Sequence, residues 1–322
     1  MFRRTLIASL LAAPTLAPSL ARAQTWPDHP IRWIINFPPG GAADTLSRAL
    51  CDSIGGKLGQ PLVPENRPGA GGLVGADLLA KAAGDTHMVL MSSAASHGIG
   101  PVLYAHVPYD PLRDFQHVAL VGTFPSVLCV NNDFPARDLA GFMAEAKRRG
   151  GLSYGSGGNG TMNHLCGQLL ARAAGVELTH VPYRGSAPAL TDTMGGQIPA
   201  IMESLPIALP HIRAGRLRPL ATSEATRAAT TPEVPTFAEA GFPQAQSTNW
   251  FGFSVAAGVP AALVQRWAGI IQAALAEPKT QERFANIGVV PGTGGPAEYT
   301  RLITDELTRW REVIRTGNIR AE

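Results

Sequence analysis

Residues 31–44 read IRWIINFPPGGAAD, and this stretch decides the class of fold. The apolar run at 31–37 predicts a strand, and the Pro-Pro-Gly-Gly sequence after it predicts a tight turn. From Asp44 to Leu58 the apolar residues recur at helical spacing, so a helix follows the turn. The unit is a strand, a glycine turn and a helix, and it places the start of the helix at the carboxyl end of the strand.

The same unit recurs along the chain. A first set has strand-like runs at 62–64 and 88–91 and a helical run at 76–83. A second set has strands near 118–122, 127–130, 153–154 and 178–181, and helices at 139–149 and 162–174. A strand at 249–255 and amphipathic helices at 261–275 and 297–314 complete the chain. Alternating strands and helices predict two α/β domains, each with a parallel, doubly wound sheet.

The two sets predict two lobes, which suits a chain of 322 residues. We expect residues 24–124 and 248–322 to form lobe 1 and residues 125–247 to form lobe 2. The chain would then cross between the lobes twice, near residues 123–126 and 246–250. Both termini of the mature chain would belong to lobe 1.

Residues 1–23 have the three parts of a secretory signal peptide. Arg3 and Arg4 come first, an apolar stretch at 6–20 follows, and the small residues at 21–23 predict cleavage after Ala23. The apolar stretch holds two prolines and is too short to span a hydrocarbon core of about 30 Å. We expect export to the periplasm, and the paired arginines suit either a Sec or a Tat signal.

Charge and apolar content exclude two kinds of partner. The chain has 27 basic and 24 acidic residues, and removing the three arginines of the leader leaves 24 of each. A neutral mature chain does not present a nucleic-acid-binding surface, so no nucleic acid partner is expected. No later stretch approaches 18 apolar residues, so we expect no membrane insertion of the mature chain, which we take to be a monomer.

Three cysteines, Cys51, Cys129 and Cys166, are too few and too scattered for a metal or redox motif. An odd number leaves at least one unpaired, and the sequence leaves open whether any two pair. We interpret them as small buried apolar residues.

The first glycine turn is a candidate ligand-binding site. At the start of a helix, backbone N–H groups and the positive end of the helix dipole can hold an anion without a cationic side chain. Glycines let the ligand approach the backbone closely, and an aspartate in the first turn is placed to cap the helix. The alternative is a tight turn that binds nothing. The candidate residues here are Pro39, Gly40, Gly41, Ala42 and Asp44.

A second glycine-rich helix start lies in the other lobe, where residues 155–161 read GSGGNGT. The segment lacks both the Gly-Lys-Ser/Thr ending of a nucleotide loop and the dinucleotide spacing, so no cofactor is expected. Its candidate ligand-binding residues are Ser156, Gly157, Gly160 and Thr161. Two such helix starts on opposite lobes predict one small carboxylate held between them.

Two further candidates, Ser93 and His97, follow the strand at 88–91. His97 either donates to a ligand or lies on a surface loop. No metal is expected, because the histidines show no HExxH or comparable spacing. The G-x-S-x-G pattern at 151–155 follows a helix instead of preceding one, so it is not a hydrolase nucleophile elbow. With no catalytic residues assigned, the chain is predicted not to be an enzyme.

At this point the sequence resembles a known family, the Bug or TctC-type receptors of tripartite tricarboxylate transporters. The resemblance runs through essentially the whole mature chain. Its motifs are WP at 26–27, PPGGAAD at 38–44, ENRPGAGG at 65–72, YDPLRDF at 109–115, YGS at 154–156 with HL at 164–165, VPYRG at 181–185, ALTD at 189–192, ALPHI at 208–212 and VPTFAEAG at 234–241.

The resemblance implies a type II periplasmic binding protein, a Venus-flytrap of two α/β lobes with two hinge crossings. It also implies a carboxylated solute, such as a di- or tricarboxylate, an amino acid or an aromatic acid, delivered to transporter membrane subunits. Family pockets hold a carboxylate largely through backbone N–H groups and water at the two glycine loops. A ligand-sensing subunit would share the binding step, and a periplasmic enzyme using the same cleft is the other alternative.

Some positions depart from the family pattern. Residues 84–88 read GDTHM where the family often has PDGYT, and residues 92–97 read SSAASH in a loop that keeps its hydroxyl groups. After 195–197 the family often carries aspartates, whereas this chain has Pro199 and Glu203. Glu203 is a candidate ligand-binding residue that either recognises an ammonium group or is a charge at a strand end. The identity of the carboxylate stays open.

Overall fold

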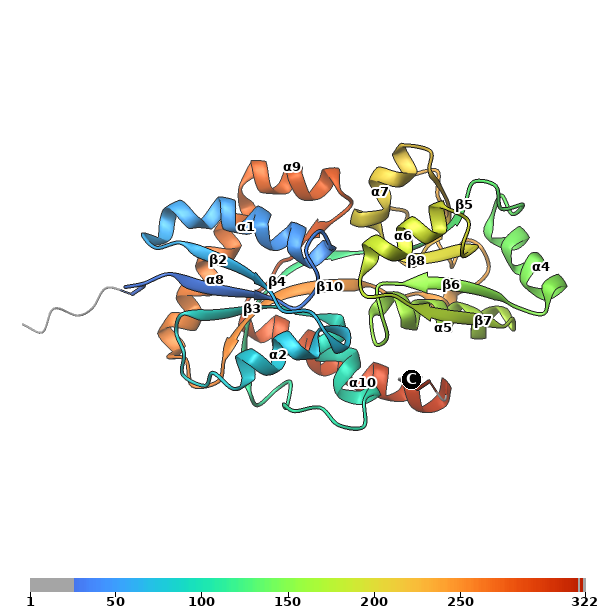
Figure 1. Cartoon of the computed structure of the whole chain (residues 1–322). Coiled ribbons are helices and arrows are strands. Elements are labelled where there is room, and N and C mark those ends of the chain that lie inside the picture. Colours follow the sequence, from blue (N-terminus) through green and yellow to red (C-terminus); the bar gives the residue numbers. More distant parts are fainter. Residues whose placement is uncertain (1–25, 318, 321–322) are drawn as a thin grey trace, which may run out of the picture.

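The computed structural model describes residues 26–317 and 319–320, so the expected signal peptide at 1–23 lies outside the described residues. Two β-sheets with flanking helices form two lobes that lie side by side (Figure 1). The first sheet has the order β11-β4-β10-β3-β1-β2 and the second has the order β7-β6-β8-β5-β9. The two-lobed α/β architecture predicted from the sequence is confirmed.

The first lobe combines segments from both ends of the described chain. Its strands are β1 (Ile31–Ile35), β2 (Leu62–Asn66), β3 (Met88–Ser93), β4 (Phe115–Phe124), β10 (Asn249–Ala256) and β11 (Val290–Pro291). Its helices are α1 (Ala42–Leu58), η1 (Ala70–Gly72), α2 (Leu73–Ala80), η2 (Ala94–Ile99), α3 (Gly100–Leu103), α8 (Ala261–Ala276), α9 (Pro278–Asn286) and α10 (Pro296–Gly317). Alternate residues of β1 are buried against the apolar faces of α1 and α8. This packing fixes the position at which α1 begins after the strand.

The second lobe is one continuous stretch of chain. Its strands are β5 (Ser126–Asn131), β6 (Leu152–Ser156), β7 (Leu178–Pro182), β8 (Ala200–Ser204) and β9 (Leu217–Thr222). Its helices are α4 (Leu139–Arg149), α5 (Met162–Ala174), α6 (Ser186–Met194), α7 (Leu205–Arg213) and the short η3 (Pro243–Ala245). A separate core of buried apolar residues lies within it, as expected for a lobe that folds around its own sheet.

Both sheets are mixed, whereas the alternating pattern predicts parallel sheets. In the first sheet β10 runs antiparallel to β3 and β4, and in the second β5 runs antiparallel to β8 and β9. The reason is the crossing of the chain. Most strands run toward the other lobe, but β5 and β10 begin where the chain has just crossed, so they run away from it.

The lobes are also connected behind the sheets. Helix α10 lies along both lobes (Figure 1), and its residues Leu307 and Trp310 share an apolar cluster with Met162 and Leu165 of α5. Only Pro125 separates β4 from β5 at the first crossing. The two lobes therefore meet along short connections and one helix, an arrangement that permits rotation about the crossings.

Two properties of the described chain bear on the predictions above. All three cysteines are free, with Cys129 and Cys166 buried and Cys51 half-buried against the core of the first lobe. Within residues 26–317 and 319–320, no helix has the length and apolar character needed to cross a membrane.

Candidate ligand-binding cleft

A cavity of about 580 Å³ lies between the lobes. Its volume is in the range that holds a small organic molecule. Lobe 1 contributes residues 37–43, Thr45, residues 93–95, residues 249–251 and Ile287. Lobe 2 contributes Gly157, residues 161–163, residues 184–188, Leu190, Thr191, Met194, Glu203, Ser204, Pro206, Ile207, Pro210 and His211.

On lobe 1 the wall of the cavity is the start of α1. Gly40 has φ 77°, a left-handed conformation that favours glycine, and Gly41 is the N-cap residue. Within the described structure no acceptor faces the N–H groups of Ala42 and Ala43. Both residues line the cavity. The first turn of α1 therefore offers two unused donors and the positive end of a helix dipole.

Asp44 has a different role from the one predicted. It makes no capping bond to the helix and does not line the cavity. Its carboxylate accepts hydrogen bonds from Gly40 N–H, Arg48 Nε and Asn66 Nδ2, each at 3.0 Å. Burial raises the pKa of Asp44, but these donors outweigh burial and lower the pKa overall. Asp44 holds the glycine turn in shape, and its charge is paired with that of Arg48.

On lobe 2 the matching element is the start of α5. The Thr161 side chain caps this helix by accepting from the His164 N–H at 3.2 Å. Met162 and Asn163, the first two residues of the helix, line the cavity. Their N–H groups have no acceptor in the described part of the chain. Of the predicted residues in this loop, Gly157 and Thr161 line the cavity.

The other two predicted residues of this loop lie outside the cavity. Ser156 is buried, and its hydroxyl is bonded to His180 Nε2 at 2.6 Å, so it shapes the loop. Gly160 has φ 71°, and a Cβ there would lie 2.8 Å from the hydroxyl oxygen of Tyr104 in lobe 1. Gly160 is therefore a contact between lobes.

A third helix start, at α6, was missed by the sequence reasoning. Gly185 is its N-cap, and Arg184, Gly185 and Ser186 line the cavity. Arg184 is exposed at the rim and is the one arginine among the lining residues of the described chain. The only signal was the VPYRG motif at 181–185, which the sequence analysis used for the resemblance alone.

Glu203, at the end of β8, is the acid that lines the cavity in the described structure. It is 1% exposed, so it is not a surface charge at a strand end. Oε1 accepts from Asn163 Nδ2 at 3.0 Å and from the Ser204 N–H at 2.6 Å, whereas Oε2 has no hydrogen-bond partner among the described residues. Burial raises the pKa of Glu203, and the Ser204 N–H together with the nearby Ser186, Ser204 and Asn163 side chains offsets part of that rise.

Glu203 belongs to a buried polar network that reaches both crossings. Asn163 Oδ1 accepts from Ser126 Oγ at 2.7 Å and from Asn249 Nδ2 at 3.2 Å. Ser126 begins β5 and Asn249 begins β10, immediately after the two crossings. The carboxylate in the cavity is thus connected to the hinge through a single asparagine side chain.

Of the two candidates after β3, Ser93 lines the cavity and caps η2. His97 does not line it, and it is fully buried. Its ring packs against Tyr109, Phe115 and His117, and its pKa is lowered by burial first and by His117 second. His97 is buried because it lies in η2, a π-helical turn whose residues are all buried, whereas the sequence predicts a loop at this position.

The lobes touch on both sides of the cavity. The hydroxyl of Tyr104 in lobe 1 donates to the Asn159 carbonyl in lobe 2 at 3.1 Å. On the other side, a Cβ on Gly185 would lie 3.0 Å from the Cγ of Pro38. The two lobes therefore touch one another beside the cavity, and helix starts from both lobes line its wall.

Two α/β lobes closed around a cavity, with two crossings of the chain, define a two-lobed periplasmic binding protein fold. The sequence matches the family model of the tripartite tricarboxylate transporter family receptor, TctC, over residues 46–319. The chain belongs to this family.

Individual relatives extend over nearly the whole chain. It is 38% identical over 314 residues to a UPF0065 protein in the tcbD-tcbE intergenic region of Pseudomonas sp. (strain P51), covering 97% of this chain and 93% of that protein. It is 36% identical over 295 residues to Protein BugT of Bordetella pertussis, covering 91% of this chain and 90% of BugT.

Two solved structures have the same fold and hold dicarboxylates. R. palustris Rpa4515 with adipate has a TM-score of 0.88 and 31% identity, covering 92% of this chain and 99% of that one. MatC from Rhodopseudomonas palustris with bound malate has a TM-score of 0.85 and 29% identity, covering 90% of this chain and 100% of that one. The matched family model is that of a transporter receptor, and MatC is a solved relative with bound malate, in line with the resemblance in the sequence.

Proposed function

We propose that this protein is exported to the periplasm, closes its two lobes around a small carboxylate and delivers it, chemically unchanged, to the membrane subunits of a tripartite tricarboxylate-type transporter. Adipate and malate in two related structures support a di-carboxylate or a similar acid as the ligand. The hinge of the proposed movement lies at the crossings near Pro125 and Thr248.

The observation that carries the proposal is the convergence of helix starts on one cavity. Ala42 and Ala43 line it from lobe 1, Met162 and Asn163 line it from lobe 2, and the N–H groups of all four lack an acceptor among the described residues. Each helix start favours an anion by about 0.3–1 kcal/mol through its dipole, and each N–H bond to a carboxylate contributes about 1.5–3 kcal/mol. A carboxylate bonded to both lobes stabilises the closed form, because the open form offers only one of the two walls.

Glu203 adds a second requirement for the ligand. A buried carboxylate whose Oε2 lacks a partner repels an anion, unless the ligand also brings a hydrogen-bond donor to that oxygen. We therefore propose that the preferred ligand is a carboxylate with an ammonium or hydroxyl group placed to donate to Oε2. Arg184 at the rim attracts the anion during its approach.

A thermal-shift screen of the mature protein tests the proposal. The panel holds mono-, di- and tricarboxylates, amino acids and aromatic acids, together with neutral analogues in which the carboxylate is an amide. A ligand at 100 times its Kd stabilises the native state by about 2.7 kcal/mol, which shifts the melting temperature visibly. A shift with one class of acid and none with its amide is expected. Equal shifts with acid and amide would contradict carboxylate recognition at the helix starts.

A further inference from the structure

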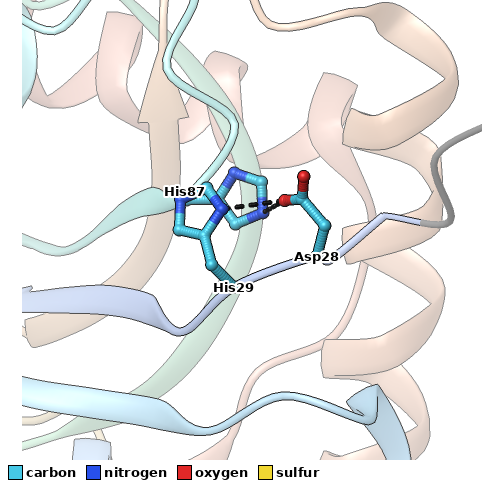
Figure 2. Close-up of side chains that lie close together, drawn as sticks. All are labelled: Asp28, His29 and His87. Atoms are coloured by element: carbon cyan, nitrogen blue, oxygen red, sulfur yellow. Dashed lines mark hydrogen bonds and ion pairs between the residues drawn. The ribbon is translucent and has the colours of Figure 1, made fainter.

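A second group of polar side chains lies at the far end of lobe 1 from the cleft. Asp28 and His29 precede β1, and His87 immediately precedes β3. Figure 2 shows both imidazole rings stacked on each other, each with a nitrogen turned toward the same carboxylate. His29 Nδ1 lies 2.8 Å and His87 Nε2 lies 3.1 Å from Asp28 Oδ1, and all three ligand atoms lie within 4.8 Å of one another.

These distances would let a metal ion replace the direct contacts between the Asp28 carboxylate and the two histidine rings. A tetrahedral Zn²⁺ ion with bonds of about 2.0–2.1 Å places its ligand atoms about 3.3 Å apart. The two nitrogens lie 2.8 and 3.1 Å from Asp28 Oδ1, near that separation, so small rotations of the exposed Asp28 and His29 side chains make room for an ion. The His29 side chain is 60% exposed, and turning it also relieves the close stacking of the rings.

His87 is oriented as a metal ligand. Its Nδ1 is hydrogen-bonded to Thr86 Oγ1 at 3.0 Å, and its backbone N–H donates to Asp85 Oδ1 at 2.7 Å. Its Nε2 is buried and makes no geometrically acceptable hydrogen bond within residues 26–317 and 319–320. When Nδ1 donates to the threonine, Nε2 presents a lone pair with no other partner, which is how a neighbouring hydroxyl fixes the tautomer of a ligating histidine.

We propose that Asp28, His29 and His87 form a binding site for a divalent transition-metal ion, Zn²⁺ by donor type, with a fourth position open to water. The site lies outside the carboxylate cleft and is independent of it. A bound ion joins the segment before β1 to the loop before β3, so it stabilises lobe 1 without changing the affinity of the cleft.

Calorimetric titration of tag-free mature protein with ZnCl₂, after treatment with EDTA and dialysis, tests the proposal. Wild type is compared with His29→Ala and His87→Asn, and with His106→Ala, which removes another exposed histidine outside the cluster. We expect about one ion per chain. We also expect binding at least about 10-fold weaker in both cluster variants and unchanged in His106→Ala.

Cobalt(II) supplies a spectroscopic readout that a purely structural histidine would not change. Intense visible absorption of the Co²⁺-loaded protein, lost in His29→Ala, indicates a four- or five-coordinate site with histidine ligands. The exposed position of His29 keeps this variant informative even if His87→Asn fails to fold. No zinc binding by wild type, or wild-type binding by folded His29→Ala, would overturn the proposal.

Discussion

Replacing Glu203 by glutamine separates the two requirements that the cleft places on its ligand. Glutamine keeps an oxygen to accept from Asn163 Nδ2 and the Ser204 N–H, at present 3.0 and 2.6 Å from Oε1. It turns the unpartnered Oε2 into an NH₂ group, which donates instead of accepting. The change therefore leaves the internal bonds in place and alters only the oxygen that has no partner among the described residues.

The expected magnitude follows from one hydrogen bond to a charged group. Losing such a bond costs about 1.5–3 kcal/mol, which lowers affinity by between about 10-fold and 150-fold. Ligands with a donor, such as malate or aspartate, should weaken by this factor in Glu203→Gln. Succinate, which lacks the donor, should bind equally or more tightly, because the buried negative charge no longer repels it.

Calorimetry with succinate, malate and aspartate on wild type and Glu203→Gln measures the effect. Glu224→Gln is the matched control, because Glu224 is a partly buried acid of lobe 2 whose pKa is also raised, by burial first, and it does not line the cavity. If Glu203→Gln changes all three affinities by the same factor, Glu203 does not read a donor on the ligand, and that part of the proposal is refuted.

Glu203→Gln also has a predicted effect on the stability of the unliganded protein. The pKa of Glu203 is raised above its ordinary value of 4.5, so its contribution to stability is present below pH 4.5 and is lost as pH rises through the raised value. Glutamine resembles the protonated acid at every pH. At neutral pH the unliganded variant should therefore be at least as stable to urea as wild type, and a large loss of stability would contradict the assignment.

Three further perturbations test other parts of the account. In Gly41→Val the added Cβ meets only the Pro38 carbonyl oxygen, at 3.4 Å, so the fold should survive. The added bulk in front of the α1 helix start should abolish ligand-induced thermal shifts, and retained shifts would exclude this wall as the site. Tyr104→Phe removes the bond between lobes to Asn159 and should weaken ligand binding about two- to ten-fold by calorimetry, with unchanged affinity arguing against closure through this contact. Burial lowers the pKa of His164 to about 4, and burial together with the neighbouring His164 lowers that of His180 to about 3. Their contribution to stability against urea should therefore be full above pH 6.5 and fall as pH drops toward 4; a flat profile would show that the folded chain protonates both histidines as readily as the unfolded chain does.

Sequence alone was sufficient where local pattern decides structure. The α5 helix has the bounds predicted for it, 162–174, because its apolar spacing, its threonine cap and the glycine after it all lie within the segment. The helix predicted from residue 44 is α1, although it begins two residues earlier, at Ala42, with Gly41 as its N-cap and no side-chain cap. The prediction of helix starts facing one another followed from the direction of parallel strands, which needs no knowledge of side-chain contacts.

The sequence did not predict the position of a side chain where distant segments of the chain determine its surroundings. His97 is buried because Tyr109, Phe115 and His117 surround it, and their positions depend on a later part of the chain. Asp44 does not line the cavity, because Asn66, on β2, and Arg48 bind its carboxylate. These partners have no signature in the residues around positions 44 and 97.

The helices α6 and α7 were missed for a local reason. Each has a proline near its start, Pro188 in α6 and Pro206 in α7, and α7 has a second, Pro210. In a short apolar pattern a proline suggests a turn. In the first turn of a helix, however, proline only lacks a backbone N–H group that would have no partner within the helix in any case. The arginine at the rim of the cleft was missed together with α6.

A crystal structure of the mature protein with the carboxylate found in the thermal-shift screen tests the central claim most directly. The account predicts one ligand carboxylate within hydrogen-bond distance of the Ala42 or Ala43 N–H groups. It also predicts that the same molecule is bonded to the start of α5 or α6 and to Glu203 Oε2. A ligand that contacts one lobe only, or that lies outside this cavity, would contradict the claim that closure of two helix starts around a carboxylate is how this protein binds.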